Sequence, residues 1–314
     1  MHNTIMFYEG KYGTSKKTAE VIAYILGNTK TYTIKEAPKT LDNYENVIFV
    51  FGFYGYETAQ IIKTFVKNVK DQLRSKKIGI IGIGISKIDF QKQLNEIGIL
   101  LERTEDISEF VEGELRLNKL SQEDYNVIKM FLKKAGMPVK DYGNFKIENV
   151  VAVADKFVQI MKMASPRMPD NLLKEEIRKF IINHNTCALA TGKGEFVRCT
   201  PLEYLYDNDN FYIITEGGLK FKGILQNDAV CIGIADNYEN MGSVKGLQIS
   251  GVAKILKLFT EEYLNIFKLK KIQLSALEKI PVNLYVIKVI PEKFEFLNAE
   301  FKKNNFASKQ ELLC

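Results

Sequence analysis

A loop of small and hydroxyl-bearing residues separates an apolar run from a helical pattern near the start of the chain. The apolar run covers residues 4–8, and Ala19 and Ile22 recur at helical spacing beyond the loop. Two further apolar runs, at residues 46–51 and 77–83, also lead into glycine-containing loops. A short continuous apolar run is typical of a strand buried on both faces. Strands that alternate with helices predict a parallel sheet covered on both sides, with its ligand at the carboxyl ends of the strands.

Helical patterns fill the rest of the first half. They cover residues 59–69, 90–101 and 122–134, and a last helix opens at 150–154 and continues to 163. The stretch from 87 to 134 is longer than a minimal connection between parallel strands. Its two helical patterns lead us to expect a cap over the ligand site.

Two prolines, Pro166 and Pro169, interrupt the pattern between the two halves. Proline cannot continue a helix and it stiffens a linker, so two prolines this close together indicate a domain boundary. We predict a first domain over 1–163, a linker over 164–169 and a second domain over 170–314. A chain of 314 residues is long enough for two domains.

The second half has short strand-like runs separated by turns. A helix over 172–183 comes first, with Asp170 or Asn171 as its expected cap. Residues 207–210, Asp-Asn-Asp-Asn, are a clear turn. Several short strands at this spacing predict an antiparallel barrel. The runs cover residues 187–191, 201–206, 211–215, 230–234, 247–256 and 283–290.

The first loop has the chemistry of a phosphate cradle. Its residues are Gly10, Lys11, Tyr12, Gly13, Thr14 and Ser15. Glycine lets backbone N–H groups turn toward a ligand, and the following helix adds partial positive charge at its N-terminus. The hydroxyls of Thr14 and Ser15 can donate further hydrogen bonds. The spacing is that of neither a P-loop nor a dinucleotide fingerprint, so spacing alone leaves a cradle and an ordinary polar turn equally open.

With the strand before it, this loop resembles the phosphate loop of the flavodoxin superfamily, above all in the branch of flavodoxin-like protoporphyrinogen dehydrogenases. Gly10 stands where that branch has serine, so one phosphate hydroxyl is missing. The resemblance covers roughly residues 1–162, including the segment 110–120, and implies a flavodoxin-like doubly wound α/β sheet that binds FMN. It also implies an aromatic loop against the flavin ring and a further wall after the third strand. These positions are Phe53, Tyr54, Gly55, Tyr56, Gly84 and Ser86.

The second half is similar to the FMN-binding split barrel of the pyridoxamine-phosphate-oxidase-like superfamily. The resemblance rests on the order of the segments 175–181, 187–191, 198–202, 211–215, 220–227 and 247–253. It implies an antiparallel split β-barrel that forms a homodimer with flavin at the interface. A solvated turn is the alternative for Lys220 and Lys222, and Gln248 and Ser250 can come from the neighbouring subunit. The flavin-binding positions it implies are Arg198, Cys199, Thr200, Pro201, Thr215, Lys220, Lys222, Gln248 and Ser250.

Composition argues against several classes of site. The net charge of +6 comes from lysines spread along the whole chain, which disfavours a nucleic-acid surface. The four cysteines form no CxxC pair and only two histidines are present, so we expect no metal site. His184 is expected to be a surface or capping residue, with heme ligation as the alternative. We find neither a signal peptide nor an apolar run of the roughly 18 residues that a membrane span needs, and we expect a cytoplasmic protein.

These features predict an FMN-dependent oxidoreductase with flavin in one or both domains, acting on a small or tetrapyrrole-like substrate. The expectation of a tetrapyrrole-like substrate is based on analogy with the two families that the chain resembles. No residue stands out as a catalytic acid or base. One alternative is a flavodoxin-type electron carrier that serves a redox partner protein, although the positive net charge disfavours it because simple flavodoxins are strongly acidic. The other is a protein that binds or transports heme or a related tetrapyrrole.

Overall fold

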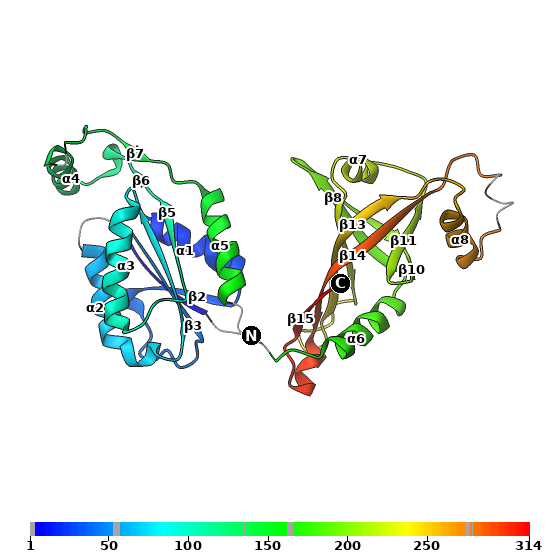
Figure 1. The fold of residues 1–314 in the computed structure, drawn as a ribbon, viewed down its shortest axis with the longest axis horizontal. Coiled ribbons are helices and arrows are strands. Elements are labelled where there is room, and N and C mark those ends of the chain that lie inside the picture. Colours follow the sequence, from blue (N-terminus) through cyan, green and yellow to red (C-terminus); the bar gives the residue numbers. More distant parts are fainter. Residues whose placement is uncertain (1–3, 53–56, 135, 162–165, 274–276, 278) are drawn as a thin grey trace. The chain divides into compact units, whose positions relative to one another are not determined.

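The computed structural model describes residues 4–52, 57–134, 136–161, 166–273, 277 and 279–314. The chain divides into two compact units, Met1–Ser165 and Pro166–Cys314. Each unit has its own sheet and its own hydrophobic core, and each is described by itself (Figure 1). Within the described residues, no helix is both long enough and apolar enough to cross a membrane.

The first unit is built on five parallel strands in the order β2-β1-β3-β4-β5. The chain leaves β1 toward one side of the sheet and then places β3 on the other side, so the strand order reverses between β1 and β3. Open α/β sheets bind ligands at such a point, outside the carboxyl ends of the strands. The predicted doubly wound parallel sheet is confirmed. The strands are β1 Thr4–Glu9, β2 Thr29–Thr33, β3 Asn46–Gly52, β4 Lys77–Gly84 and β5 Ile107–Glu112.

Two pairs of helices cover the two faces of this sheet. One face carries α2 (Glu57–Leu73) and α3 (Lys87–Leu101), and the other carries α1 (Thr14–Leu26) and α5 (Ile147–Met161) (Figure 1). β1, β3 and β4 consist almost entirely of buried residues, because helices cover both faces of the strands. This double cover explains why these strands appear in the sequence as continuous apolar runs.

The edge strands β2 and β5 were missed from the sequence. β2 has the sequence Thr-Lys-Thr-Tyr-Thr and is only partly buried. In β5, Ser108, Glu109 and Phe110 are half-buried between the buried Ile107 and Val111. A strand at the edge of a sheet keeps polar residues, so neither segment has the apolar run by which the central strands were found.

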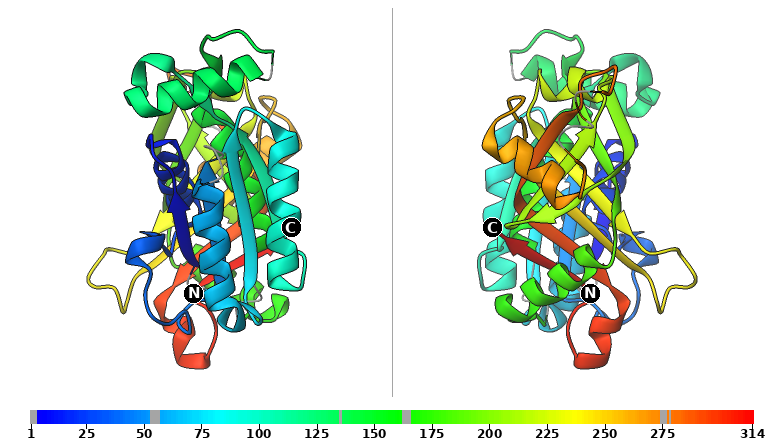
Figure 2. Two further views of the ribbon diagram at one scale, coloured as in Figure 1. Left: turned by 90° about the vertical axis from the view of Figure 1, so that its left-hand side faces the viewer. Right: turned by 90° about the vertical axis from the view of Figure 1, so that its right-hand side faces the viewer.

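The stretch after β4 was expected to cap the ligand with two helices, and one of them does not. α3 buries Phe90, Leu94 and Ile97 in the core that it shares with α2, so the expectation for this helix is wrong. The second helix, α4 (Gln122–Lys134), lies beyond the carboxyl ends of the strands (Figure 2).

A small two-stranded sheet brings the chain to α4 and back. β6 (Glu114–Leu115) pairs with β7 (Tyr142–Gly143), and the short η2 helix (Leu117–Lys119) precedes α4. The Arg116 guanidinium donates to the carbonyl oxygens of Tyr142 and Gly143, each at 3.1 Å. Gly143 has φ 70°, and a Cβ there would lie 2.2 Å from the Gly113 carbonyl oxygen, so this close approach requires glycine.

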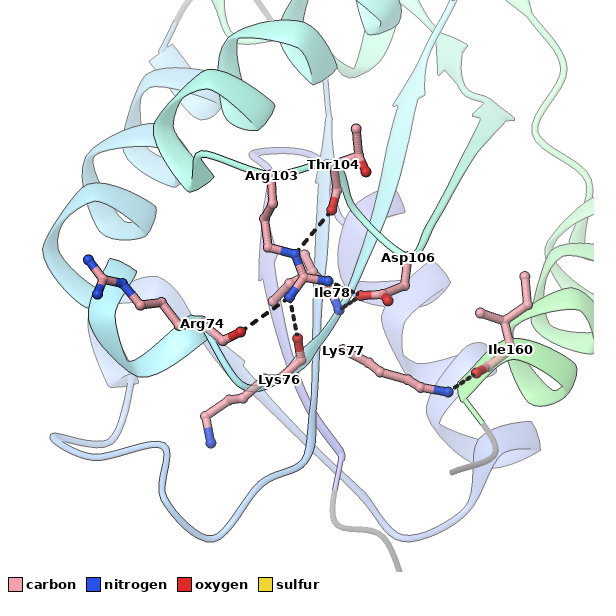
Figure 3. Close-up of polar contacts among 8 residues, drawn as sticks. All are labelled: Arg74, Lys76, Lys77, Ile78, Arg103, Thr104, Asp106 and Ile160. Atoms are coloured by element: carbon pink, nitrogen blue, oxygen red, sulfur yellow. Dashed lines mark hydrogen bonds and ion pairs between the residues drawn. The ribbon is translucent and has the colours of Figure 1, made fainter. Parts of the chain in front are cut away.

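An ion pair between Arg103 and Asp106 lies at the amino ends of β4 and β5 (Figure 3). Arg103 Nη2 donates to Asp106 Oδ2 at 2.7 Å, and the same oxygen accepts the backbone N–H of Ile78 at 2.7 Å. Arg103 Nη1 also donates to the carbonyl oxygen of Lys76 at 3.1 Å. These bonds join the start of β4 to the turn before β5, at the opposite end of the strands from their carboxyl ends.

The second unit is a curled antiparallel sheet of eight strands in the order β10-β11-β14-β13-β12-β8-β9, with β15 also paired to β14. α6 (Asp170–Ile182) packs into its core, and α8 (Glu261–Leu269) packs against β11 and β14 through a smaller cluster. The predicted split barrel is confirmed. The strands are β8 Thr186–Lys193, β9 Phe196–Glu203, β10 Leu205–Asp207, β11 Asn210–Thr215, β12 Ala229–Ala235, β13 Lys245–Ile255, β14 Tyr285–Asn298 and β15 Lys309–Leu313.

Two local predictions in this unit need correction. Asp170 is the first helical residue of α6 and Pro169 stands at its N-cap, so neither expected cap residue occupies that position. The run predicted over 201–206 is divided between β9 and β10 at Tyr204. Tyr204 is buried and its hydroxyl donates to the carbonyl oxygen of Ile181, in the last turn of α6, at 2.6 Å.

Candidate functional site

A pocket opens at the carboxyl edge of the first sheet, beside the point where the strand order reverses. It holds about 150 Å³ and lies between the loop after β1 and the segment from β5 to α4. Its lining combines the loop, the ends of β3 and β4, and the added segment. The lining residues are Gly10, Lys11, Tyr12, Thr14, Ser15, Gly52, Ile83, Gly84, Ile85, Gly113, Glu114, Leu115, Arg116, Lys119, Leu120 and Ile128.

The N-terminus of α1 faces this pocket without a side-chain cap. Gly13 stands at the N-cap with φ 87° and contributes no capping side chain, and the first turn contains no acidic residue. The first backbone N–H groups of a helix have no partner inside the helix. Thr14 and Ser15 line the pocket, so the end of α1 offers backbone donors and two hydroxyls to an anionic group there.

The side chain of Ser15 is buried between two glycines. It lies against Gly10 in the loop after β1 and against Gly52 at the end of β3. These two strands flank the point of reversal. Ser15 therefore brings the loop after β1 into contact with the neighbouring strand β3, beside the point where the strand order reverses.

α4 is tied to the loop from Gly10 to Ser15 through Asp124. Lys11 Nζ lies 2.7 Å from Asp124 Oδ2, and the Tyr12 hydroxyl donates to the same oxygen. Hydrogen bonding to Lys11, and then to Tyr12, lowers the pKa of Asp124, and the Asp124 carboxylate raises the pKa of Lys11. The Tyr12 hydroxyl also accepts the backbone N–H of Ser121 at 3.2 Å. The start of α4 is thus bonded to Lys11 and Tyr12 of the loop.

The sequence did not indicate three other charged residues of this pocket. Glu114 accepts from Arg116 Nη2 at 3.2 Å and from Lys119 Nζ at 3.1 Å. These residues follow β5, which was itself missed as a strand. Without that strand, nothing in the sequence placed the segment near the loop after β1, although residues 113–120 lay inside the stretch that resembled the flavodoxin branch.

The remaining predicted residues of the first unit have different positions. Gly84, the last residue of β4, lines the pocket. Ser86 is not among the lining residues; its Oγ accepts the backbone N–H of Asp89 at 3.3 Å and so caps α3. Phe53, Tyr54, Gly55 and Tyr56 lie outside the described residues.

In the second unit, strand pairing divides the predicted residues between two faces of the sheet. Alternate residues of a strand point to opposite faces, and residues directly opposite one another share a face. Leu189 and Thr191 of β8 are buried on the inner face. Thr200 lies opposite Leu189 and Arg198 lies opposite Thr191, so both belong to the inner face.

α7 (Lys220–Ile224) adds a buried cation to this inner face. Lys220 is 6% exposed and its ammonium donates to the Gly217 carbonyl oxygen. Burial, and then the nearby charge of Arg198, lowers the pKa of Lys220. Among the residues that the structure describes, no carboxylate pairs with Lys220. The Oγ1 atoms of Thr191 and Thr200 are buried there without a hydrogen-bond partner.

The other predicted residues of this unit lie elsewhere. Cys199 and Pro201 alternate with Arg198 and Thr200 and so belong to the outer face. On β13, Gln248 and Ser250 alternate with the buried Leu247 and Ile249 and also belong to the outer face. β12 and β8 separate β13 from β9, a distance of roughly 14 Å across the sheet. Lys222 is exposed, with its ammonium 4.7 Å from the centre of the Phe196 ring.

Comparison with known protein families agrees with this architecture. Residues 5–140 match the family model of the flavodoxin domain, and residues 173–298 match that of pyridoxamine 5′-phosphate oxidase. The chain is a flavodoxin-like domain followed by an oxidase-like split-barrel domain. Both families are associated with flavins, which indicates a flavin-type cofactor. No match was found among curated proteins.

Solved structures resemble the chain only distantly. A putative pyridoxamine 5′-phosphate oxidase from Listeria innocua is 23% identical, with a TM-score of 0.33, and the match covers 40% of this chain and 98% of that one. The heme storage protein HutZ from Vibrio cholerae is 15% identical, with a TM-score of 0.33 and coverage of 38% and 90%. ChuZ from Campylobacter jejuni is 14% identical, with a TM-score of 0.38 and coverage of 56% and 74%. Likenesses this distant carry no information on what this chain binds.

His184, the alternative heme ligand, and the buried Cys187 both have structural roles in the split-barrel domain. His184 follows α6, with Nδ1 2.7 Å from the Phe180 carbonyl oxygen and Nε2 2.8 Å from Asp236 Oδ1. Both ring nitrogens are therefore engaged within the chain. Burial raises the pKa of the Cys187 thiol to about 12, which keeps it protonated in the core. In the part of the chain that the structure describes, no three His, Cys, Asp or Glu side chains are grouped to hold a metal ion.

Proposed function

We propose that this chain is an FMN-dependent oxidoreductase whose flavodoxin-like domain holds the FMN phosphate in the loop from Gly10 to Ser15. The observation that carries the proposal is the uncapped N-terminus of α1, which faces a pocket beside the reversal of strand order. A phosphate dianion is the ligand for which such a helix end is suited.

The residues present offer hydrogen-bond donors that suit the phosphate of this group. The backbone N–H groups at the start of α1 and the hydroxyls of Thr14 and Ser15 would hold the phosphate. Gly52 and Gly84 end their strands without side chains, which leaves room for a flat ring beside the sheet edge. Phe53 to Tyr56 are proposed to stack on that ring, as the resemblance implies.

The split-barrel domain supports a second flavin site on its inner face. Arg198 and Lys220 would neutralise a phosphate, and the buried hydroxyls of Thr191 and Thr200 lack the partners that an anionic ligand would supply. Gln248 and Ser250 lie on the outer face of the sheet, so one protomer does not bring them to this cluster. This separation supports the proposal that a homodimer completes the site.

A flavin bound in the first pocket would accept or donate the electron pair that the reaction transfers. The protein's part is to bind and orient. Leu115, Leu120 and Ile128 give the pocket an apolar side. Arg116 and Lys119 lie beside it and share the carboxylate of Glu114, which leaves one net positive charge there. An apolar substrate with an acidic group, which includes tetrapyrroles, suits that side. The engagement of both His184 nitrogens disfavours this histidine as a heme ligand.

The proposal is tested by counting flavins on the purified full-length protein. We expect a flavin absorbance spectrum and, after saturation with FMN, about two FMN per chain if both sites bind. Thr14→Ala should weaken FMN binding to the first domain and Arg198→Ala should weaken it to the second, whereas Thr40→Ala, an exposed threonine, should weaken neither. Failure to bind FMN, or a Thr14→Ala protein with unchanged stoichiometry and affinity, would overturn the assignment to the first loop.

A further inference from the structure

The phosphate loop contains one cation, and that cation is already paired. Lys11 Nζ lies 2.7 Å from Asp124 Oδ2, and the Asp124 side chain is 12% exposed. Of the lysines that follow on α1, Lys16 lies 3.9 Å from Glu20, and Lys17 lies over the Phe145 ring. The positive charge of Lys11 is therefore neutralised by Asp124, a residue of α4 outside the loop.

Asp124 is held firmly in this position. Its carboxylate also accepts from the Tyr12 hydroxyl, and its backbone N–H donates to Ser121 Oγ at 3.2 Å at the start of α4. Lys11 is the more accessible partner, with half of its side chain exposed. A carboxylate fixed this close to a phosphate loop repels a dianion unless Lys11 stays beside it.

We propose that Asp124 is a specificity-determining residue of the phosphate loop, which withholds the charge of Lys11 so that phosphate is bound by neutral donors alone. The inference rests on the proposed FMN site. A loop without net charge binds a bare anion weakly and needs the flavin ring for affinity, so it favours a flavin phosphate over inorganic phosphate and other small anions.

The test changes the two charges separately and together. Asp124→Asn leaves an oxygen to accept from Tyr12 but releases Lys11, so FMN should bind about 3- to 10-fold tighter and inorganic phosphate should compete better. Lys11→Met leaves the carboxylate uncompensated, so FMN should bind about 3- to 10-fold more weakly. The double variant should return close to the wild-type affinity, and riboflavin, which has no phosphate, should bind all of these proteins equally.

Glu123→Gln is the matched control, because Glu123 is an exposed acid in the same turn of α4. It removes one negative charge without releasing Lys11, so it should change FMN affinity less than Asp124→Asn does. Measurements use the full chain carrying Arg198→Ala and Lys220→Met, so that the split barrel does not contribute. If Asp124→Asn disturbs folding, Lys11→Met still tests the proposal, because Lys11 is half exposed.

Two results would overturn the inference. One is that Asp124→Asn and Lys11→Met shift FMN affinity in the same direction. The other is that riboflavin affinity shifts as much as FMN affinity. Either would mean that Asp124 only shapes the loop. A failure of the FMN site itself looks different, because Thr14→Ala would then leave FMN binding unchanged in the same background.

Discussion

The hydroxyl oxygen of Ser15 occupies the space beside Gly10: a Cβ atom on Gly10 would lie 2.5 Å from Ser15 Oγ and 3.0 Å from Ser15 Cβ. A Cβ on Gly52 would lie 3.4 Å from the same oxygen. Ser15 is 3% exposed, so it has little freedom to move aside. The resembled branch has serine at position 10, where this chain has glycine. The Ser15 hydroxyl fills the space that a side chain at position 10 would take, so glycine is required there for packing.

Gly10→Ala should destabilise the first domain and weaken FMN binding. Overpacking of this kind costs about 1–3 kcal/mol of the free energy of unfolding, and the shift of Ser15 would disturb the loop. Adding Ser15→Ala removes the closer of the two contacts and should restore part of the stability, though not FMN affinity. Chemical denaturation and an FMN titration measure the two effects.

Gly98→Ala is the control for this substitution. Gly98 lies inside α3, where a Cβ would meet its nearest atom, the Arg103 carbonyl oxygen, at an ordinary 3.6 Å. Alanine is the better helix former, so this variant should gain about 0.5–1 kcal/mol. A Gly10→Ala protein as stable as Gly98→Ala would show that the loop relaxes freely around Ser15.

How far the sequence predicts the first domain depends on which residues face the core. β3 and β4 are buried on both faces and were found as apolar runs, whereas β2 and β5 lie at the edges and were not. The loop from Gly10 to Ser15 was found because local chemistry defines it. Asp124 contacts Lys11 across more than a hundred residues of chain, and such a contact leaves no local pattern.

Lys220→Met should stabilise the split-barrel domain in the absence of ligand. Burial and the charge of Arg198 both disfavour the ammonium form of Lys220, which is why its pKa is lowered. Methionine fills a similar volume without the charge, so the melting temperature should rise at pH 7. The same change should weaken the binding of phosphate-bearing ligands to this domain, which thermal melts with and without FMN would show.

The stabilisation should depend on pH in a defined direction. Below the folded-state pKa, Lys220 is protonated in both folded and unfolded chains, and the full penalty of burying its charge applies. As pH rises through that value toward the ordinary 10.5, the folded protein loses the proton first and the penalty falls. The difference between Lys220→Met and wild type should therefore shrink at alkaline pH. Lys222→Met, at an exposed lysine of the same helix, should show no such dependence of its stability difference on pH.

Residues of the split barrel were predicted from the resemblance as one set, and strand pairing divides them. Arg198 and Cys199 are neighbours in sequence, yet they point to opposite faces of β9. The position of α7 could not be read from the sequence, because its five residues are too few to show helical periodicity. The cluster of Arg198, Thr200 and Lys220 thus depends on tertiary structure.

Asp106→Ala should destabilise the flavodoxin-like domain without altering its ligand site. The Asp106 carboxylate accepts from Arg103 and from the Ile78 backbone, and its loss leaves the buried N–H of Ile78 without that partner (Figure 3). Such a loss costs about 1–3 kcal/mol of the free energy of unfolding, which chemical denaturation would measure.

Asp71→Ala is the control for this substitution. Asp71 pairs with Arg74 through side chains that are 86% and 69% exposed, so the free energy of unfolding should change by no more than about 0.5 kcal/mol. FMN affinity should be unchanged in both proteins, because Ile78 lies near the start of β4 whereas the pocket lies at the far end of this strand. Equal stabilities of the two variants would mean that this end of the sheet does not depend on the Arg103–Asp106 pair.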